Sequence, residues 1–78
     1  MKELLEYLAR GLVDSPDEVE VVEVPEDDGT LVLELSVGED DYGIVIGRGG
    51  RTAAALRTVV KAAAANEKRR VFVDIVDS

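Results

Sequence analysis

Apolar side chains near the start of the chain recur every three or four residues, with charged side chains between them. They are Met1, Leu4, Leu5, Leu8 and Leu12. Because this spacing places all of them on one face of a helix, it predicts an amphipathic helix over residues 1–12. The next residues, 14–17, contain Asp, Ser and Pro, which favour a turn and should end the helix.

The pattern then changes to that of two strands joined by a turn. Residues 19–24 are rich in β-branched valine, and residues 30–37 alternate apolar with mostly polar positions. Residues 25–29 between them contain Pro, Asp and Gly, so a hairpin is predicted. The alternation in the first strand slips between Val21 and Val22, which indicates a bulge at that point.

Two helices and a last strand complete the pattern. Acidic residues at 39–41 are typical of a helix start, and the surrounding glycines limit this helix to residues 42–46. Strong helix formers occupy residues 51–65, and residues 71–76 are again rich in β-branched side chains. The apolar positions of the long helix are Ala53, Leu56, Val60 and Ala63. The predicted order is therefore αββααβ.

This order predicts an α+β fold. A helical crossover before the last strand favours a parallel pairing with the strand that precedes the crossover, whereas the hairpin is antiparallel. We therefore expect a three-stranded mixed sheet covered on one face by helices. No linker or repeat interrupts the chain, so residues 1–78 are expected to form a single domain.

Composition excludes several classes of site. The chain has 78 residues and contains no Cys and no His, which removes disulfides and the usual zinc ligands. The acids Asp27, Asp28, Asp40 and Asp41 lack the ordered spacing of a metal site, so they are expected to be solvated. No cofactor and no catalysis are expected. The N-terminal segment carries charges within every apolar stretch, so neither a signal peptide nor a membrane span is predicted, and a cytoplasmic location is expected.

Charge is distributed unevenly along the chain. The net charge is -8, yet residues 1–44 hold two basic residues against fourteen acidic ones, whereas residues 45–78 hold seven basic against three acidic. A net negative charge disfavours nucleic-acid binding, because attraction to phosphate dominates such affinity. The positive second half reverses that expectation, and the positive charge is expected to gather around one glycine-rich motif.

That motif is Gly47-Arg48-Gly49-Gly50, which lies between two predicted helices. Glycine permits a positive φ, and without a Cβ atom the turn lets a ligand approach the backbone closely. The first amides of the following helix, from Arg51, should be free to bind phosphate, and Arg48 and Arg51 add positive charge. The spacing fits neither a Walker A loop nor a dinucleotide fingerprint.

Residues 43–57 resemble the signature of the KH family, in which an Ile-Gly-x-x-Gly turn joins two helices. The αββααβ order is similar to the type II KH arrangement, and the whole chain resembles the small bacterial single-KH proteins of the KhpA family. One departure is Ala53, where many KH motifs carry a bulky aliphatic residue.

The resemblance implies binding of single-stranded RNA. The glycine turn would clamp the backbone of about four nucleotides, and bases would lie on Ile46, Leu56, either Ile44 or Val45, and the last strand. Arg57 and Lys61 lie on one helix face and either extend the phosphate track or are simply solvated. Residues 68–70 are expected to flank a turn.

The family also implies partners and a role. Its members are associated with self-pairing, with pairing to a larger multidomain KH protein, with RNA chaperone activity and with control of cell division and elongation. Small residues at 53–55 and 62–65 offer a candidate helix face for dimerisation. The alternative from a different class is a protein-interaction subunit, in which the acidic residues 14–41 meet a partner and the RNA site is vestigial.

Overall fold

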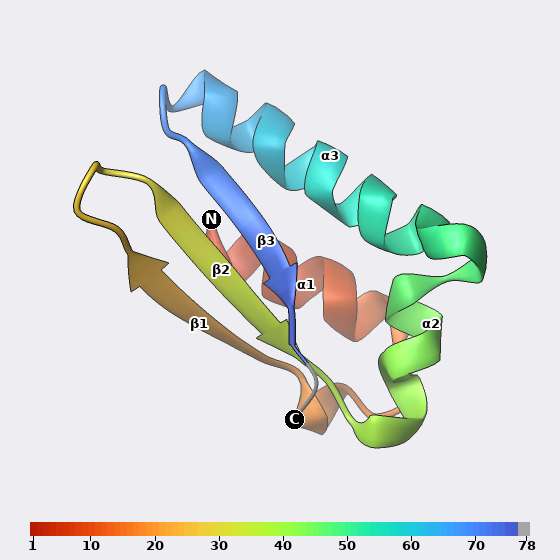
Figure 1. Cartoon of the computed structure of the whole chain (residues 1–78). Coiled ribbons are helices and arrows are strands. Elements are labelled where there is room, and N and C mark those ends of the chain that lie inside the picture. The colour runs from red at the N-terminus through yellow and green to blue at the C-terminus, as the bar shows by residue number, and fades with distance from the viewer. Residues whose placement is uncertain (77–78) are drawn as a thin grey trace.

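The helical and alternating segments of the sequence form the predicted elements in the predicted order. The structure, a computed structural model, describes residues 1–76, so the last two positions of the expected domain 1–78 lie outside the described residues. The helices are α1 (Lys2–Leu12), α2 (Tyr42–Ile46) and α3 (Arg51–Asn66), and the strands are β1 (Glu20–Pro25), β2 (Leu31–Ser36) and β3 (Val71–Ile75). Short 3-10 turns form at Pro16–Glu18, Glu39–Asp41 and Arg48–Gly50. The order αββααβ is confirmed (Figure 1).

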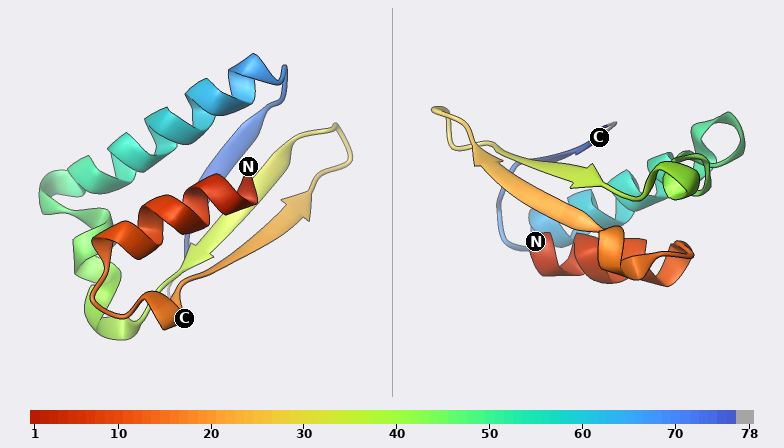
Figure 2. Two further views of the ribbon diagram at one scale, coloured as in Figure 1. Left: turned by 180° about the vertical axis from the view of Figure 1, so that it is seen from behind. Right: turned by 90° about the horizontal axis from the view of Figure 1, so that it is seen from below.

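The three strands form one mixed sheet in the order β1-β2-β3. β1 and β2 are antiparallel, and β2 and β3 are parallel. The helices lie on one face of this sheet and leave the other face uncovered, as the two views of Figure 2 show. The α+β arrangement predicted from the crossover is therefore confirmed.

The predicted bulge in β1 is wrong. The pairing of β1 with β2 runs without interruption from Glu20 opposite Ser36 to Pro25 opposite Leu31. Val21 is buried on the helix-covered face, whereas Val22 lies on the open face and is 44% exposed. The two consecutive valines therefore reflect an apolar residue on the open face and not an extra residue in the strand.

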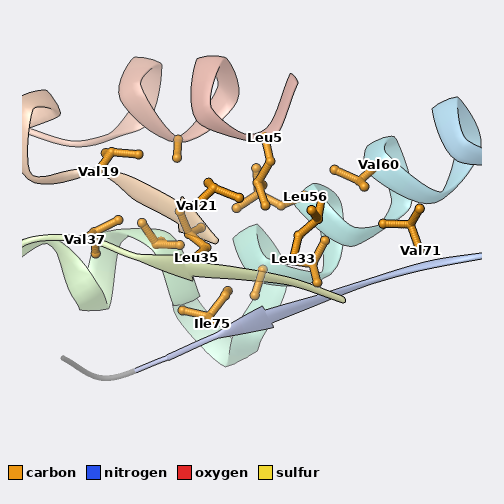
Figure 3. Packing of buried hydrophobic residues seen from close by; sticks show 14 of the residues in the cluster. Leu5, Val19, Val21, Leu33, Leu35, Val37, Leu56, Val60, Val71 and Ile75 are labelled. Atoms are coloured by element: carbon orange, nitrogen blue, oxygen red, sulfur yellow. The ribbon is translucent and has the colours of Figure 1, made fainter. Parts of the chain in front are cut away.

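The core lies between the sheet and the helices (Figure 3). Its fully buried large side chains come from α1, β2, α2 and α3 and are Leu5, Leu33, Leu35, Val45 and Val60. Each such side chain contributes about 1.5–3 kcal/mol when it leaves water. On α3 the buried positions are Ala53, Leu56, Val60 and Ala64, so the apolar face ends at Ala64 instead of the predicted Ala63.

None of the helices within residues 1–76 combines the length and apolar character needed to cross a membrane. Over the same residues, no three carboxylates come close enough together to hold a metal ion.

Candidate nucleic-acid interface

The turn between α2 and α3 is built on three glycines with positive φ. Gly47 has φ 76° and ψ 170°, a combination that is essentially restricted to glycine. Gly49 and Gly50 have φ values of 64° and 78° and lie in the left-handed region. This backbone reverses the chain between the two helices, at the end of the molecule opposite the β1–β2 hairpin turn (Figures 1 and 2).

The three glycines differ in what surrounds them. A Cβ atom at Gly47 would lie 2.8 Å from the backbone nitrogen of Thr52 and would also collide with the Thr52 side chain. At Gly49 and Gly50 a Cβ atom would meet no heavy atom within 4 Å. Gly47 is therefore required by the protein's own packing, whereas the space beside Gly49 and Gly50 is open to an incoming molecule.

Backbone amides in this turn are only partly used. The Gly50 amide donates to the Gly47 carbonyl at 3.1 Å, and the Arg51 amide donates to the Arg48 carbonyl. Gly47 lies inside no hydrogen-bonded turn, so the amides of Arg48 and Gly49 do not donate back to the carbonyls of α2. Within residues 1–76, neither amide donates to a side chain or to a backbone carbonyl outside the helices. Of the amides predicted to be free, from Arg51 to Ala54, that of Arg51 is therefore engaged, and the loop itself adds free donors at Arg48 and Gly49.

No side chain caps the beginning of α3, so the positive end of the helix dipole faces the loop. Arg48 and Arg51 are both exposed there, and neither forms a salt bridge with any described residue. Two exposed arginines and two free amides therefore lie within one short segment, residues 48–51. This combination of donors and positive charge suits a phosphate group.

Arg57 is held against the sheet. Its Nε donates to the carbonyl oxygen of Val73 on β3 at 3.2 Å. Lys61, one helical turn further along α3, places its Nζ 5.2 Å from the centroid of the Phe72 ring. Both side chains thus bridge α3 and β3 and are engaged with the protein, so neither is simply solvated.

Apolar residues predicted to hold bases have different surroundings. Ile44 is 39% exposed beside the turn, whereas Val45 is fully buried in the core. Ile46 packs partly against that core. Leu56 is only 5% exposed, and it lines a hollow next to Leu8 of α1. Of the two alternatives Ile44 and Val45, the structure therefore leaves only Ile44 accessible, and Leu56 offers little surface to a ligand.

Positive charge is spread more widely than the sequence suggested. Arg48 and Arg51 lie at the glycine turn, but Lys61, Arg69 and Arg70 line a hollow at the opposite end of α3. A helix of this length separates its ends by about 24 Å. The expectation that positive charge gathers around the motif is therefore wrong, since only two of the seven basic residues in 45–78 adjoin the turn.

Asp41 is a residue whose role the sequence analysis missed. It is 2% exposed, and its carboxylate accepts hydrogen bonds from the amides of Asp14 at 3.2 Å and Ser15 at 3.0 Å. The prediction that it is solvated is wrong, because these bonds join the segment after α1 to the start of α2. No sequence pattern distinguishes Asp41 from its exposed neighbour Asp40. The hydrogen bonds of Asp41 are therefore evident only from the structure.

Comparison with known proteins agrees with the geometry. Residues 2–75 match the family described as KhpA/KhpB, KH domain. The chain is 59% identical over 78 residues to a protein of Halalkalibacterium halodurans named RNA-binding protein KhpA, covering 99% of this chain and 100% of that protein. It is 54% identical over 76 residues to the protein of the same name from Clostridium acetobutylicum, covering 97% of this chain and all of that protein.

Solved structures show the same fold. Era from Aquifex aeolicus bound to GDP.AlF4- superposes with a TM-score of 0.63 and 21% identity, covering 95% of this chain and 28% of the Era chain. A structure of Era in complex with MgGDPNP and nucleotides of 16S ribosomal RNA gives a TM-score of 0.57 at 22% identity, again over 28% of that chain. The chain thus spans a little over a quarter of each Era chain, and the likeness concerns the fold.

Proposed function

The chain belongs to the KhpA/KhpB family of KH domains, and from this premise we propose that it is a non-catalytic protein that binds single-stranded RNA through the turn Gly47–Gly50. The observation that carries the proposal is the pair of free amides at Arg48 and Gly49 beside two exposed guanidinium groups. Relatives named RNA-binding protein KhpA support the same function.

Phosphates are the first contact in this proposal. The backbone of about four nucleotides runs along the glycine turn, as in other KH domains. Arg48 and the Gly49 amide bind phosphate oxygens directly, Gly47 and Gly50 set the shape of the turn, and Arg51 adds charge at the start of α3. Open space beside Gly49 and Gly50 admits the sugar-phosphate chain.

Bases then lie beside the turn, toward α2 and the free edge of β3. Ile44 and the accessible part of Ile46 provide apolar contact, and Leu56 supports this surface from within the core. Arg57 lies between α3 and β3, where its remaining donors can reach a base or a phosphate. With three aromatic residues in the chain, base stacking contributes little, so affinity for a short RNA is expected to be weak.

Replacing both Arg48 and Gly49 by Asp tests the site. The double variant places two carboxylates where phosphate should bind, and Asp tolerates the left-handed conformation of Gly49. We expect it to lose binding to a short single-stranded RNA of mixed sequence in fluorescence anisotropy, while thermal unfolding changes little.

The chain contains a matched control for this experiment. Arg10 and Gly11 form the same dipeptide at an exposed position of α1, and no heavy atom lies within 4 Å of an added Cβ at Gly11. The pair R10D/G11D therefore makes the same change of charge away from the turn and should leave RNA binding nearly intact. Equal RNA affinity in R48D/G49D and the parent protein would disprove the proposed site.

Pairing raises the affinity of such a weak module. We place self-association on α3 and α1, where Leu8, Leu12, Ala55 and Val59 line an apolar hollow of about 220 Å³. Two linked RNA sites bind a longer RNA more tightly than one site through their effective concentration. We propose this surface as the site of a homodimer, of a heterodimer with a larger multidomain KH protein, or of both. A monomer in sedimentation at tens of micromolar would contradict the homodimer.

The resemblance to the family supports a proposal for the wider role. We propose that the protein acts in the cytoplasm as an RNA chaperone linked to control of cell division and elongation. Chaperone activity predicts faster annealing of complementary RNA strands by the parent protein than by R48D/G49D. Crosslinking in cells followed by sequencing of the bound RNA identifies the targets.

A further inference from the structure

The open face of the sheet carries an apolar row that no helix or strand within residues 1–76 covers. Val24, Val32 and Phe72 are register partners across β1, β2 and β3. Their side chains alternate with the buried ones of each strand, so they project from the face opposite the helices. Phe72 is 43% exposed, and Val24 and Val32 are half-buried. The neighbouring Val22 on the same face extends this row along β1.

Carboxylates border the row on both sides. Glu34 and Asp74 are register partners two residues along their strands from Val32 and Phe72, a separation of about 7 Å. On the other side, Glu26, Asp27 and Asp28 of the hairpin turn line an open hollow of about 450 Å³ together with Val32 and Phe72. We call this surface, comprising the row and its five bordering carboxylates, the acidic sheet face. Arg70 also lines this hollow, and with Lys61 and Arg69 it lines a neighbouring hollow that includes Phe72, so the edge of the row at β3 is basic.

This distribution of charge determines which kind of molecule can bind the acidic sheet face. RNA is repelled, because its phosphates would lie against five carboxylates. A second copy of the chain placed face to face would bring two identical sets of carboxylates together, which is also unfavourable. A segment with a central apolar side chain and basic side chains on either side complements both features. Lys61, held over one side of the Phe72 ring, already illustrates a cation resting on this aromatic residue.

We infer that the acidic sheet face docks a basic, apolar segment of a partner protein. The apolar side chains of that segment cover Val24, Val32 and Phe72, and its lysines or arginines pair with Glu34, Asp74 and the hairpin carboxylates. The glycine turn lies at the other end of the molecule, so RNA and this partner can bind the same chain together (Figure 1).

A peptide titration of the full chain tests this inference. The probe is a short synthetic peptide with three valines at its centre and two arginines on each side, and its charge-reversed counterpart carries glutamates in place of the arginines. We expect the arginine peptide to shift the backbone amide resonances of β1, β2 and β3 in nitrogen-15 NMR spectra, with the largest changes around Val32 and Phe72. The glutamate peptide should shift none of them.

Variants with equal charge changes separate the acidic sheet face from general attraction to an acidic protein. E34K/D74K should weaken peptide binding about tenfold, since two ion pairs are lost. E3K/D17K alters two exposed acids on α1 and the turn after it and should retain binding. Phe72→Thr, which keeps a residue suited to a strand, should also weaken binding.

Three results would overturn the inference. Equal weakening by E3K/D17K and E34K/D74K would mean that the peptide responds to net charge alone. Largest shifts around Leu8 and Val59 would place the peptide in the α1–α3 hollow. Shifts of the same strand amides by RNA would assign the face to RNA. None of these results depends on the glycine turn, which R48D/G49D tests separately.

Discussion

The two ends of α3 use the same backbone conformation for opposite purposes. At the beginning, Gly49 and Gly50 adopt positive φ and leave amide donors of the turn free. At the end, Lys68 adopts φ 57°, and its amide and that of Arg69 donate to the carbonyls of Ala65 and Ala64. These two bonds form a Schellman motif, in which the helix end is closed by its own backbone.

The difference shows how one helix can offer free backbone amides to a ligand at its beginning, while its end is closed by backbone hydrogen bonds. A left-handed residue after a helix brings later amides back onto the helix carbonyls. Before the helix, the carbonyls of Gly47 and Arg48 accept from the amides of Gly50 and Arg51, and the amides of Arg48 and Gly49 are left free. Both ends carry basic residues, so the free amides, and not the charge, distinguish the proposed RNA site.

The largest expected effect is a loss of protein stability when Gly47, at the beginning of α3, is replaced. Gly47→Ala forces a side chain into a glycine-only conformation and into contact with Thr52. We expect the free energy of unfolding to fall by about 3 kcal/mol, measured by urea denaturation. Gly49→Asn, which has open space and a permitted conformation, should cost less than about 1 kcal/mol. Equal losses would show that the two glycines are not distinct.

The next largest effect is the difference in RNA affinity between variants at the beginning of α3 and variants at its end. R48Q/R51Q removes both guanidinium groups at the open end and should weaken binding by on the order of tenfold to a hundredfold. The dependence of log K on log salt should become shallower by about 1.4, as expected for two fewer phosphate contacts on a single strand. K68Q/R69Q makes the same charge change at the sealed end and should have a smaller effect. Similar losses in both variants would move the RNA site away from the glycine turn.

Replacing Lys68 by glycine should stabilise the C-terminal end of α3. A non-glycine residue is strained in the left-handed region, so Lys68→Gly should raise the free energy of unfolding by about 0.5–1 kcal/mol. Thermal or urea unfolding measures the change, and Lys68→Asn should fall between the two. A loss of stability in Lys68→Gly would indicate that the lysine side chain makes a favourable contact outweighing the strain.

The smallest effect concerns a third turn, which a side chain closes. The hydrogen bond from the Thr30 amide to the Asp28 carboxylate, at 2.9 Å, lowers the pKa of Asp28 below its ordinary value of 3.8. Stabilisation by the ionised carboxylate is therefore complete above pH 3.8 and is lost as pH falls through the lowered pKa. Asp28→Asn should lose stability less steeply below pH 3.8 than the parent protein. Identical slopes in acid denaturation would contradict this assignment.

Much of the fold could be predicted because its patterns are local. The alternation in β2, the alanine-rich helix α3 and the confinement of α2 to Tyr42–Ile46 between glycines are each visible in a short window of sequence. The Gly47–Gly50 turn follows from the same reasoning. That it binds RNA stays a prediction, since geometry and charge establish only that it suits a phosphate.

Features that depend on contacts between distant segments could not be predicted. Asp41 is buried because residues 14 and 15 fold back over it, which no local pattern records. Val22 looked like part of a bulge because the open face of a sheet is usually polar, whereas here it is partly apolar. The burial of Leu56 beside Leu8 depends on where α1 packs.

The bond from Arg57 to the Val73 carbonyl also limits how the sheet can grow. β3 is an outer strand, and an outer strand with free carbonyls can recruit a strand from another molecule. A guanidinium nitrogen already occupies one of these carbonyls, so an added strand would have to displace it. This single side chain therefore raises the cost of adding a strand beside β3.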